Sequence, residues 1–282
     1  MTLTSAPTIA VTGSTGTIGR GVADRLAAGK VRQRLIVRDP SRAPRLPHAQ
    51  VAVASYADFE HAREALAGMR TLFMVSASED PDRLAEHRSF VDAAVAAGVG
   101  RIVYLSFYGA SEHATFLLAR DHWQTERHIA ATGLAYTFLR DNLYADFLPR
   151  MAGPDGVIRG PAGDGRVGAV AQVDVMDVAS VVLTEAGEHD LATYDITGPE
   201  SLSLAEAAEI IGLATGRAMT YQSESVEQAF ASRAGLGAPD WQVAAWVSTY
   251  TAIAAGELDG VSDDVRRITG HEPLSLSTLF GG

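Results

Sequence analysis

The sequence contains no cysteine, so it can form no disulfide, no thiolate metal site and no cysteine nucleophile. It has no apolar run of the roughly 20 residues that a membrane span needs. Its N-terminus also lacks the basic, apolar and small-residue order of a signal peptide. Together these absences predict a soluble, cytoplasmic protein that does not contact a membrane.

Positive charge is scarce as well. Lys and Arg number 23 against 34 Asp and Glu, which gives a net charge of −11 and disfavours nucleic acid as a partner. Lys30 is the only lysine, and every other basic residue is arginine. Any mechanism that needs a catalytic lysine therefore has one candidate.

Short apolar runs are abundant in the first half of the chain, and helical patterns separate most of them. Such alternation predicts an α/β fold with a doubly wound parallel sheet (a Rossmann fold), which binds ligands at the carboxyl ends of its strands. The predicted strands, each buried on both faces, are Ile9–Val11, Leu35–Val37, Val51–Val53, Leu72–Val75, Ile102–Leu105 and Tyr136–Leu139.

Capping signals mark the helices of this half. Asp58 is placed to open a helix through Leu66. Asp80 with Pro81 has the order of an N-cap and first helical residue, which predicts a helix from there to about Gly98.

The regular alternation stops after residue 142. Residues 151–168 are rich in glycine, which predicts a long flexible segment that covers the substrate. A helix is expected after Asp177, and capping boxes at Ser203–Glu206 and Ser225–Gln228 predict two more. The predicted domains are a dinucleotide-binding core, 1–140 with 173–198 returning to it, and a small, mainly helical C-terminal substrate cap, 141–172 and 199–282.

The most informative motif follows the first strand, where three glycines lie three residues apart. Gly13 suits a tight turn, Gly16 a close approach to phosphate oxygens, and Gly19 close packing of a helix on the strand. The free N–H groups and dipole of that helix would face a pyrophosphate. The predicted cofactor-binding residues of this loop are Gly13, Ser14, Thr15, Gly16, Thr17, Ile18 and Gly19.

The second strand ends at Arg38, whose guanidinium suits the 2′-phosphate of NADP. Arg42 would add a second contact. We therefore expect NADPH as the cofactor in preference to NADH. Asp39 would reverse this preference if its side chain, rather than that of Arg38, turned toward the cofactor.

Residues at the ends of later strands should also border the cofactor. These are Val75, Ser76, Ala77, Ser106, Phe107 and Asn142. Tyr108 follows the fifth strand, and its phenol would either face a substrate or pack under the cap.

These motifs resemble the NmrA-like, atypical short-chain dehydrogenase/reductase family, and most of all its type 2 NADPH:quinone oxidoreductases. The resemblance covers about residues 8–215. It departs at Asp39, where the family often has Asn, and at Ser55, which stands where the family often has an Asp near the adenine. The matching segments are 11–19, 37–40, 94–106, 133–140, 173–179 and 195–200.

The resemblance also points to a candidate catalytic residue. Lys30 has no tyrosine four residues before it, so the Tyr-x-x-x-Lys dyad of ordinary short-chain dehydrogenases is excluded. In the related reductases a basic residue on the helix of residues 115–132 reaches the nicotinamide, and His122 matches it. His122 would donate a proton, with Glu126 orienting it, or be a structural histidine. The other histidines, expected at the surface and without metal-site spacing, are His48, His61, His87, His113, His128, His189 and His271.

The resemblance implies an NADPH-dependent reductase of a quinone or a similar conjugated carbonyl compound. The alternatives are a non-catalytic NADP-sensing regulator of the NmrA type and a reductase of a specialised biosynthetic intermediate. The expected partner is a small-molecule substrate, and the sequence leaves open whether two copies of the chain form a homodimer. No metal is expected.

Overall fold

The computed structural model describes residues 8–185 and 187–281. The elements up to the sixth strand are β1 Ile9–Val11, α1 Thr17–Ala28, β2 Gln33–Val37, η1 Pro40–Arg42, β3 Ala49–Val53, α2 Phe59–Leu66, β4 Thr71–Val75, α3 Arg83–Ala96, β5 Arg101–Phe107, α4 Leu117–Ala131 and β6 Ala135–Asp141. The later elements are η2 Ala145–Met151, β7 Val157–Gly160, β8 Arg166–Val167, α5 Gln172–Thr184, β9 Ala192–Ile196, β10 Leu202–Ser203, α6 Leu204–Thr215, β11 Thr220–Ser223, α7 Val226–Arg233, η3 Ala234–Leu236, α8 Asp240–Ala254, α9 Asp264–Thr269 and α10 Leu276–Gly281.

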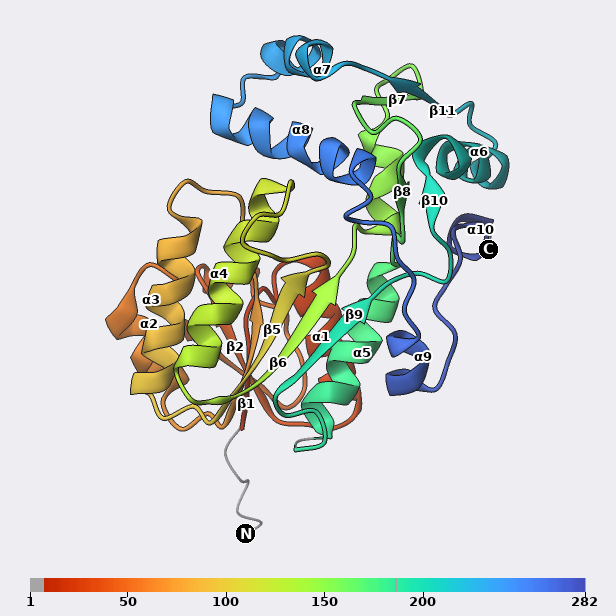
Figure 1. Cartoon of the computed structure of the whole chain (residues 1–282). Helices are drawn as coiled ribbons and strands as arrows, with labels where there is room; N and C mark the ends of the chain where they lie inside the picture. Colours follow the sequence, from red (N-terminus) through yellow and green to blue (C-terminus); the bar gives the residue numbers. More distant parts are fainter. Residues whose placement is uncertain (1–7, 186, 282) are drawn as a thin grey trace. The chain divides into compact units, whose positions relative to one another are not determined.

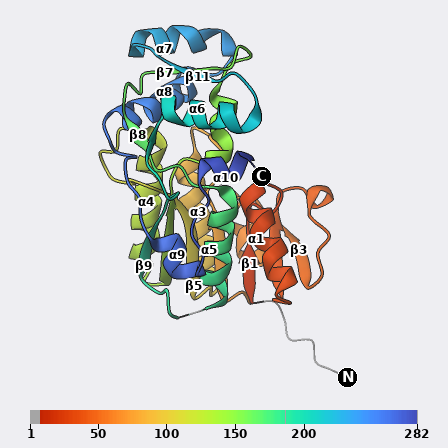
Figure 2. The same ribbon diagram turned by 90° about the vertical axis from the view of Figure 1, so that its right-hand side faces the viewer.

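Seven strands form the central sheet in the order β3-β2-β1-β4-β5-β6-β9. The neighbouring pairs from β3 to β5 are parallel. Helices α2, α3 and α4 lie on one face of the sheet, and α1 and α5 lie on the other (Figure 1, Figure 2). The strand order reverses between β1 and β4, where folds of this type bind their ligands. The predicted doubly wound α/β fold is confirmed. Among the described residues, no helix has the length and apolar character required to cross a bilayer.

The chain divides into two compact units. The first contains the residues up to Ser106, Gln124–Leu139 and Val175–Tyr194. The second contains Phe107–Trp123, Arg140–Asp174 and the residues from Asp195 onward. The predicted domains, whose outer limits lie outside the described residues, differ from these units chiefly at residues 107–123 and stay a prediction.

The first unit is built around the buried strands of the sheet. Phe73 and Met74 of β4 and Tyr104 of β5 are fully buried, as is Phe90 of α3. Met74, Tyr104 and Phe90 form one cluster with apolar side chains of α2, α3 and α4. The free energy gained by burying them holds the strand ends, and hence the loops that follow them, in fixed positions.

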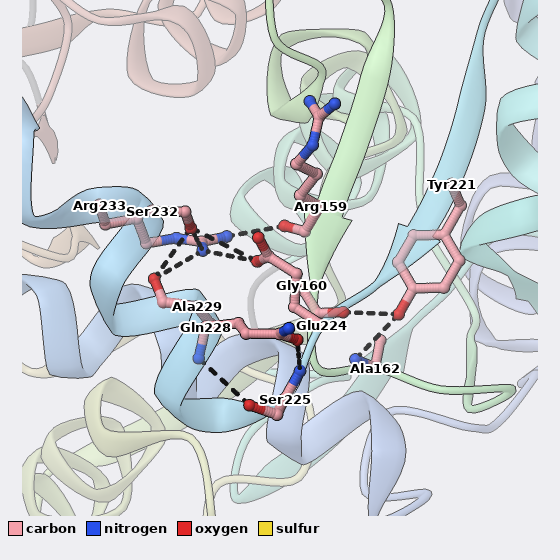
Figure 3. A network of polar contacts seen from close by, with 10 residues as sticks. All are labelled: Arg159, Gly160, Ala162, Tyr221, Glu224, Ser225, Gln228, Ala229, Ser232 and Arg233. Carbon is pink, nitrogen blue, oxygen red and sulfur yellow. Dashed lines mark hydrogen bonds and ion pairs between the residues drawn. The ribbon is translucent and has the colours of Figure 1, made fainter.

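The second unit contains α6–α10 and two short strand pairs, parallel β7·β11 and antiparallel β8·β10. A polar network joins α7 to β7 and β11 (Figure 3). Arg233 donates to the backbone oxygen of Arg159 at 2.7 Å and pairs with the half-buried carboxylate of Glu224 at 3.3 Å. The Tyr221 hydroxyl donates to the oxygen of Gly160 at 2.7 Å. Both predicted capping boxes, at Ser203 and at Ser225, are confirmed.

The prediction that β3 is buried on both faces is wrong. Val51 and Val53 are 46% and 51% exposed. Alternate residues of a strand share a face, and β3 is the outermost strand of the sheet. The helices therefore leave this face uncovered at the edge.

Two helix starts also differ from the predictions. Helix α3 begins at Arg83 rather than at Pro81, because the carboxylate of Asp80 accepts the N–H of Asp82 at 2.9 Å and forms a turn before the helix. Helix α5 begins at Gln172 rather than after Asp177. Its first turn, Gln172–Val175, alternates polar and apolar residues, a pattern that is typical of a strand and so hides the start of the helix.

The predicted long flexible segment, residues 151–168, contains strands β7 and β8. Its glycines allow close packing. A Cβ at Gly160 would lie 2.2 Å from the ring of Tyr250, and one at Gly165 would lie 2.1 Å from the oxygen of Ile253. The prediction of flexibility is wrong at these positions, because the glycines let other parts of the second unit approach the backbone.

Candidate cofactor site

The first unit has a cavity of about 240 Å³ at the carboxyl ends of its strands. Among the described residues that line it, Arg38 carries the positive charge, and Glu79, Asp80 and Glu86 carry negative charge. The lining residues are Thr12, Gly13, Thr15, Ile36, Val37, Arg38, Ala54, Ser55, Tyr56, Ala57, Val75, Ser76, Ala77, Ser78, Glu79, Asp80 and Glu86.

The glycine loop turns at one end of this cavity. Gly13 has a φ of +65°, which disfavours any residue with a side chain, and a Cβ there would lie 2.9 Å from that of Val75. A Cβ at Gly19 would lie 2.4 Å from the backbone oxygen of Gly13. The close helix–strand packing predicted for Gly19 is therefore confirmed.

The same loop fits the pyrophosphate of a dinucleotide. No side chain caps the N-terminus of α1, where Gly16 is the N-cap. The hydroxyl of Ser14 is buried and has no hydrogen-bond partner among the described residues. Backbone N–H groups and a hydroxyl without partners next to a helix N-terminus suit an anion. Thr15 lines the cavity, Thr17 is exposed, and Ile18 is buried as the first apolar contact of α1.

Arg38 and Asp39 have separate surroundings. Arg38 lines the cavity, whereas Asp39 caps the short helix η1 and accepts from Ser41 Oγ at 2.7 Å and from Ser41 N–H at 2.9 Å. These two bonds lower the pKa of Asp39. The cavity therefore presents a guanidinium rather than a carboxylate at the end of β2, which favours a 2′-phosphate. Arg42 is exposed on η1 and does not line the cavity.

Tyr56, which sequence reasoning missed, lies beside the predicted Ser55 in the cavity wall. Its hydroxyl lies 2.6 Å from Thr12 Oγ1 and 2.5 Å from the oxygen of Val75, and its ring stacks on Phe90 with centroids 4.2 Å apart. Burial raises the pKa of this phenol. Ligands bind at strand ends in this fold, and Tyr56 directly follows Ser55 after β3. Applying this rule to the residue after Ser55 would have predicted Tyr56.

The prediction that His87 and His189 are surface residues is wrong. His87 is fully buried, and His189 is 8% exposed. Burial, with the nearby charge of Arg83, lowers the pKa of His87 to about 3. Residues 83, 87, 90, 91 and 94 are all buried on α3. This helical spacing was a signal in the sequence, but the polar character of histidine hid it.

The predicted strand-end residues of the first unit fall into two groups. Val75, Ser76 and Ala77 line the cavity. Ser106 is buried, and its hydroxyl donates to the buried carboxylate of Glu126 at 2.6 Å.

Four predicted residues belong to the second unit. His122 is 6% exposed, and its ring centroid lies 6.1 Å from that of Phe107. Tyr108 packs so closely on Gly260 that a Cβ there would lie 2.0 Å from the phenol oxygen. Asn142 is buried, and both polar ends of its amide have backbone partners, Leu258 at 3.1 Å and Leu143 at 2.8 Å. A role for these four in binding or catalysis stays a prediction.

Comparisons with known proteins agree with this geometry. The family described as NAD(P)H-binding matches residues 13–188. Quinone oxidoreductase 2 of Escherichia coli is 31% identical over 276 residues, which cover 95% of this chain and 96% of the relative. Its crystal structure with NADPH has a TM-score of 0.87 and covers 95% of this chain and 97% of that chain.

Two further relatives have similar coverage. The NAD(P)H azoreductase of Xenophilus azovorans is 31% identical and covers 93% of each chain. The Citrobacter sp. triphenylmethane reductase, solved with NADP(H), is 31% identical with a TM-score of 0.85 and covers 96% of this chain and 98% of that chain. The chain therefore belongs to the NAD(P)H-binding family, and its predicted likeness to the NmrA-like reductases and type 2 quinone oxidoreductases is confirmed.

Proposed function

We propose that this protein is an NADPH-dependent reductase of quinones or similarly conjugated acceptors. The observation that carries the proposal is the cavity of the first unit, where Arg38 at the end of β2 shares the lining with Gly13 and Thr15 of the glycine loop. That loop leads into the uncapped N-terminus of α1. The relatives support the acceptor class. Quinones, azo compounds and triphenylmethane dyes, which their names specify, all have a conjugated, electron-poor system.

The cavity and the glycine loop next to it would bind different parts of NADPH. The N–H groups of α1 and the hydroxyl of Ser14 would hold the pyrophosphate, and Arg38 would hold the 2′-phosphate. When bound, NADPH supplies a hydride from its nicotinamide ring. The protein then has to place the acceptor against that ring, which is a problem of position more than of acid–base catalysis. A reaction that depends on positioning rather than on an acid–base dyad suits a chain that has no Tyr-x-x-x-Lys motif.

His122 and Tyr108 are our candidates for residues that contact the acceptor. The imidazole would donate a proton to the reduced acceptor or orient it. If His122 has this role, His122→Gln should lower kcat at saturating NADPH while the Kd for NADPH stays unchanged. An unchanged kcat would assign it a structural role, and Tyr108→Phe tests the phenol in the same way.

Turnover measurements test the proposal directly. We expect NADPH oxidation to follow the addition of a benzoquinone, a naphthoquinone, an azo dye or a triphenylmethane dye, with NADH a poorer donor. Tight binding of NADPH without turnover of any acceptor would contradict the reductase and favour a cofactor sensor. Failure to bind either dinucleotide would remove the basis of both.

We also propose a cytoplasmic location, where cells keep NADPH reduced, and assembly as a homodimer. Cell fractionation tests the location, and sedimentation velocity of the purified protein tests the assembly. A fraction confined to another compartment, or a species other than a dimer, would contradict the respective proposal.

A further inference from the structure

Side chains hold the end of β4 where the pairing of strands stops. The paired register of β1 with β4 ends at Phe73, and that of β5 with β4 ends at Val75. At Val75 the backbone N–H donates to Thr12 Oγ1 at 2.9 Å, and the backbone oxygen accepts from the Tyr56 hydroxyl at 2.5 Å. Polar side chains thus replace the missing strand partner.

Two residues of α3 hold Ala77 in the same way. The N–H of Ala77 donates to His87 Nε2 at 2.8 Å, and Arg83 Nε donates to the oxygen of Ala77 at 3.0 Å. Arg83 and His87 lie one helical turn apart and are both buried. Ala77 itself lines the cavity, together with Ser76 and Ser78. One helix therefore fixes both backbone polar groups of a residue in the cavity wall.

The hydrogen bonds also fix the tautomer of His87. A backbone N–H can only donate, so Nε2 carries no proton. The proton is then on Nδ1, which donates to Thr125 Oγ1 at 2.9 Å. The ring has Tyr56 and Tyr104 at its edges, with centroids 6.1 and 6.0 Å away. In these surroundings His87 is a neutral acceptor with a fixed orientation, not a proton donor.

We infer that His87 is a positioning residue for the cofactor. Its ring accepts the N–H of Ala77 and so holds the segment 76–78 in the wall of the cavity. The inference rests on the proposed binding of NADPH. Without His87 the segment 76–78 would lose a hydrogen bond that orders it in the free protein. NADPH would then have to order this segment on binding, which would lower the affinity. A histidine that only fills the core would change stability but not the affinity of the folded protein.

Three variants separate these roles. His87→Leu removes the acceptor, His87→Gln keeps an amide oxygen that can accept the N–H of Ala77, and His128→Leu is the matched control. His128 also joins α4 to α3, through Asp92 at 2.7 Å, but it does not line the cavity. NADPH fluorescence titration gives the Kd, and hydrogen exchange followed by NMR reports on the amide of Ala77.

We expect the Kd for NADPH to rise about tenfold in His87→Leu, as the loss of one buried hydrogen bond implies. The amide of Ala77 should exchange faster in this variant. His87→Gln should restore most of the affinity, and His128→Leu should match the wild type. In turnover, KM for NADPH should rise while kcat at saturating NADPH stays unchanged.

Equal Kd values in wild type and His87→Leu, with equal exchange at Ala77, would overturn the inference alone. A wild type that binds no NADPH would overturn the proposed function itself. If His87→Leu does not fold, ¹⁵N-histidine spectra of the wild type decide. A neutral His87 with its proton on Nδ1 at pH 7 supports the inference, and a charged ring or a proton on Nε2 refutes it.

Discussion

At the scale of single residues, Arg38→Gln tests whether Arg38 binds the 2′-phosphate. If it does, the variant loses a charged hydrogen bond that NADH never makes, so KM for NADPH should rise by about 10- to 100-fold while KM for NADH changes little. Steady-state kinetics with both dinucleotides measures this. Arg45→Ala, which removes an exposed arginine outside the cavity, is the control. An equal loss with NADPH and NADH would show that Arg38 does not bind the phosphate.

Single residues could be interpreted from the sequence where their role depends on backbone conformation. Gly13 and Gly19 are such residues, because a positive φ and a close helix contact each demand the absence of a side chain. Tyr56 and His87 are not, because their roles depend on contacts with Val75 and Ala77, which are distant in sequence. The place of Arg38 at a strand end indicates its role, but only the structure shows Asp39 bonded to Ser41.

At the scale of elements, helix starts were predicted well where one local hydrogen bond decides them. Ser203 with Glu206 and Asp58 with His61 form the caps that their spacing indicates. The prediction for residues 151–168 was wrong because their neighbours come from elsewhere in the chain. Tyr250 and Ile253 of α8 press on this segment, and no local pattern indicates that.

Gly160→Ala tests whether glycine here serves packing. The added Cβ would lie 2.2 Å from the ring of buried Tyr250, so the backbone or ring has to move. The free energy of unfolding should fall by about 1–3 kcal/mol. Gly235→Ala is the matched control, since nothing lies within 4 Å of its Cβ position. Urea denaturation compares the two. Equal stabilities would support the flexible segment that the sequence predicted.

At the scale of the whole molecule, the sheet could be predicted because each strand is a local apolar run and right-handed crossovers limit the strand order. The second unit could not, because its structure depends on side-chain contacts between residues far apart in the sequence rather than on a series of paired local strands. Thr115, for example, donates to Glu257, which lies 142 residues away. The cofactor cavity, built from consecutive strands, is accordingly the better predicted part of the candidate site.

The stability of the whole molecule should depend on pH through two buried groups whose pKa values shift in opposite ways, so that rising pH changes the free energy of unfolding in opposite directions. Burial raises the pKa of Asp141, whose carboxyl oxygen accepts from the hydroxyl of Tyr144, to about 8. Its proton is held more tightly when the chain is folded, so its contribution to the free energy of unfolding falls as pH rises from about 4 to about 8. His87, with a pKa lowered to about 3, has the reverse effect, and its contribution rises with pH from about 3 to about 6.5.

Between about pH 4 and 6.5 these two effects on the free energy of unfolding oppose each other. Of the two, only that of Asp141 remains above pH 6.5, where it lowers the free energy of unfolding by at most about 1.4 kcal/mol per pH unit. Asp141→Asn keeps an acceptor for Tyr144 but cannot ionise. We therefore expect the variant to lose less stability than the wild type between pH 6.5 and 8, as measured by urea denaturation at several pH values. Parallel profiles would mean that Asp141 is already ionised at pH 6.5 in the folded protein. In that case its negative charge would need a stabilising partner beyond the Tyr144 hydroxyl.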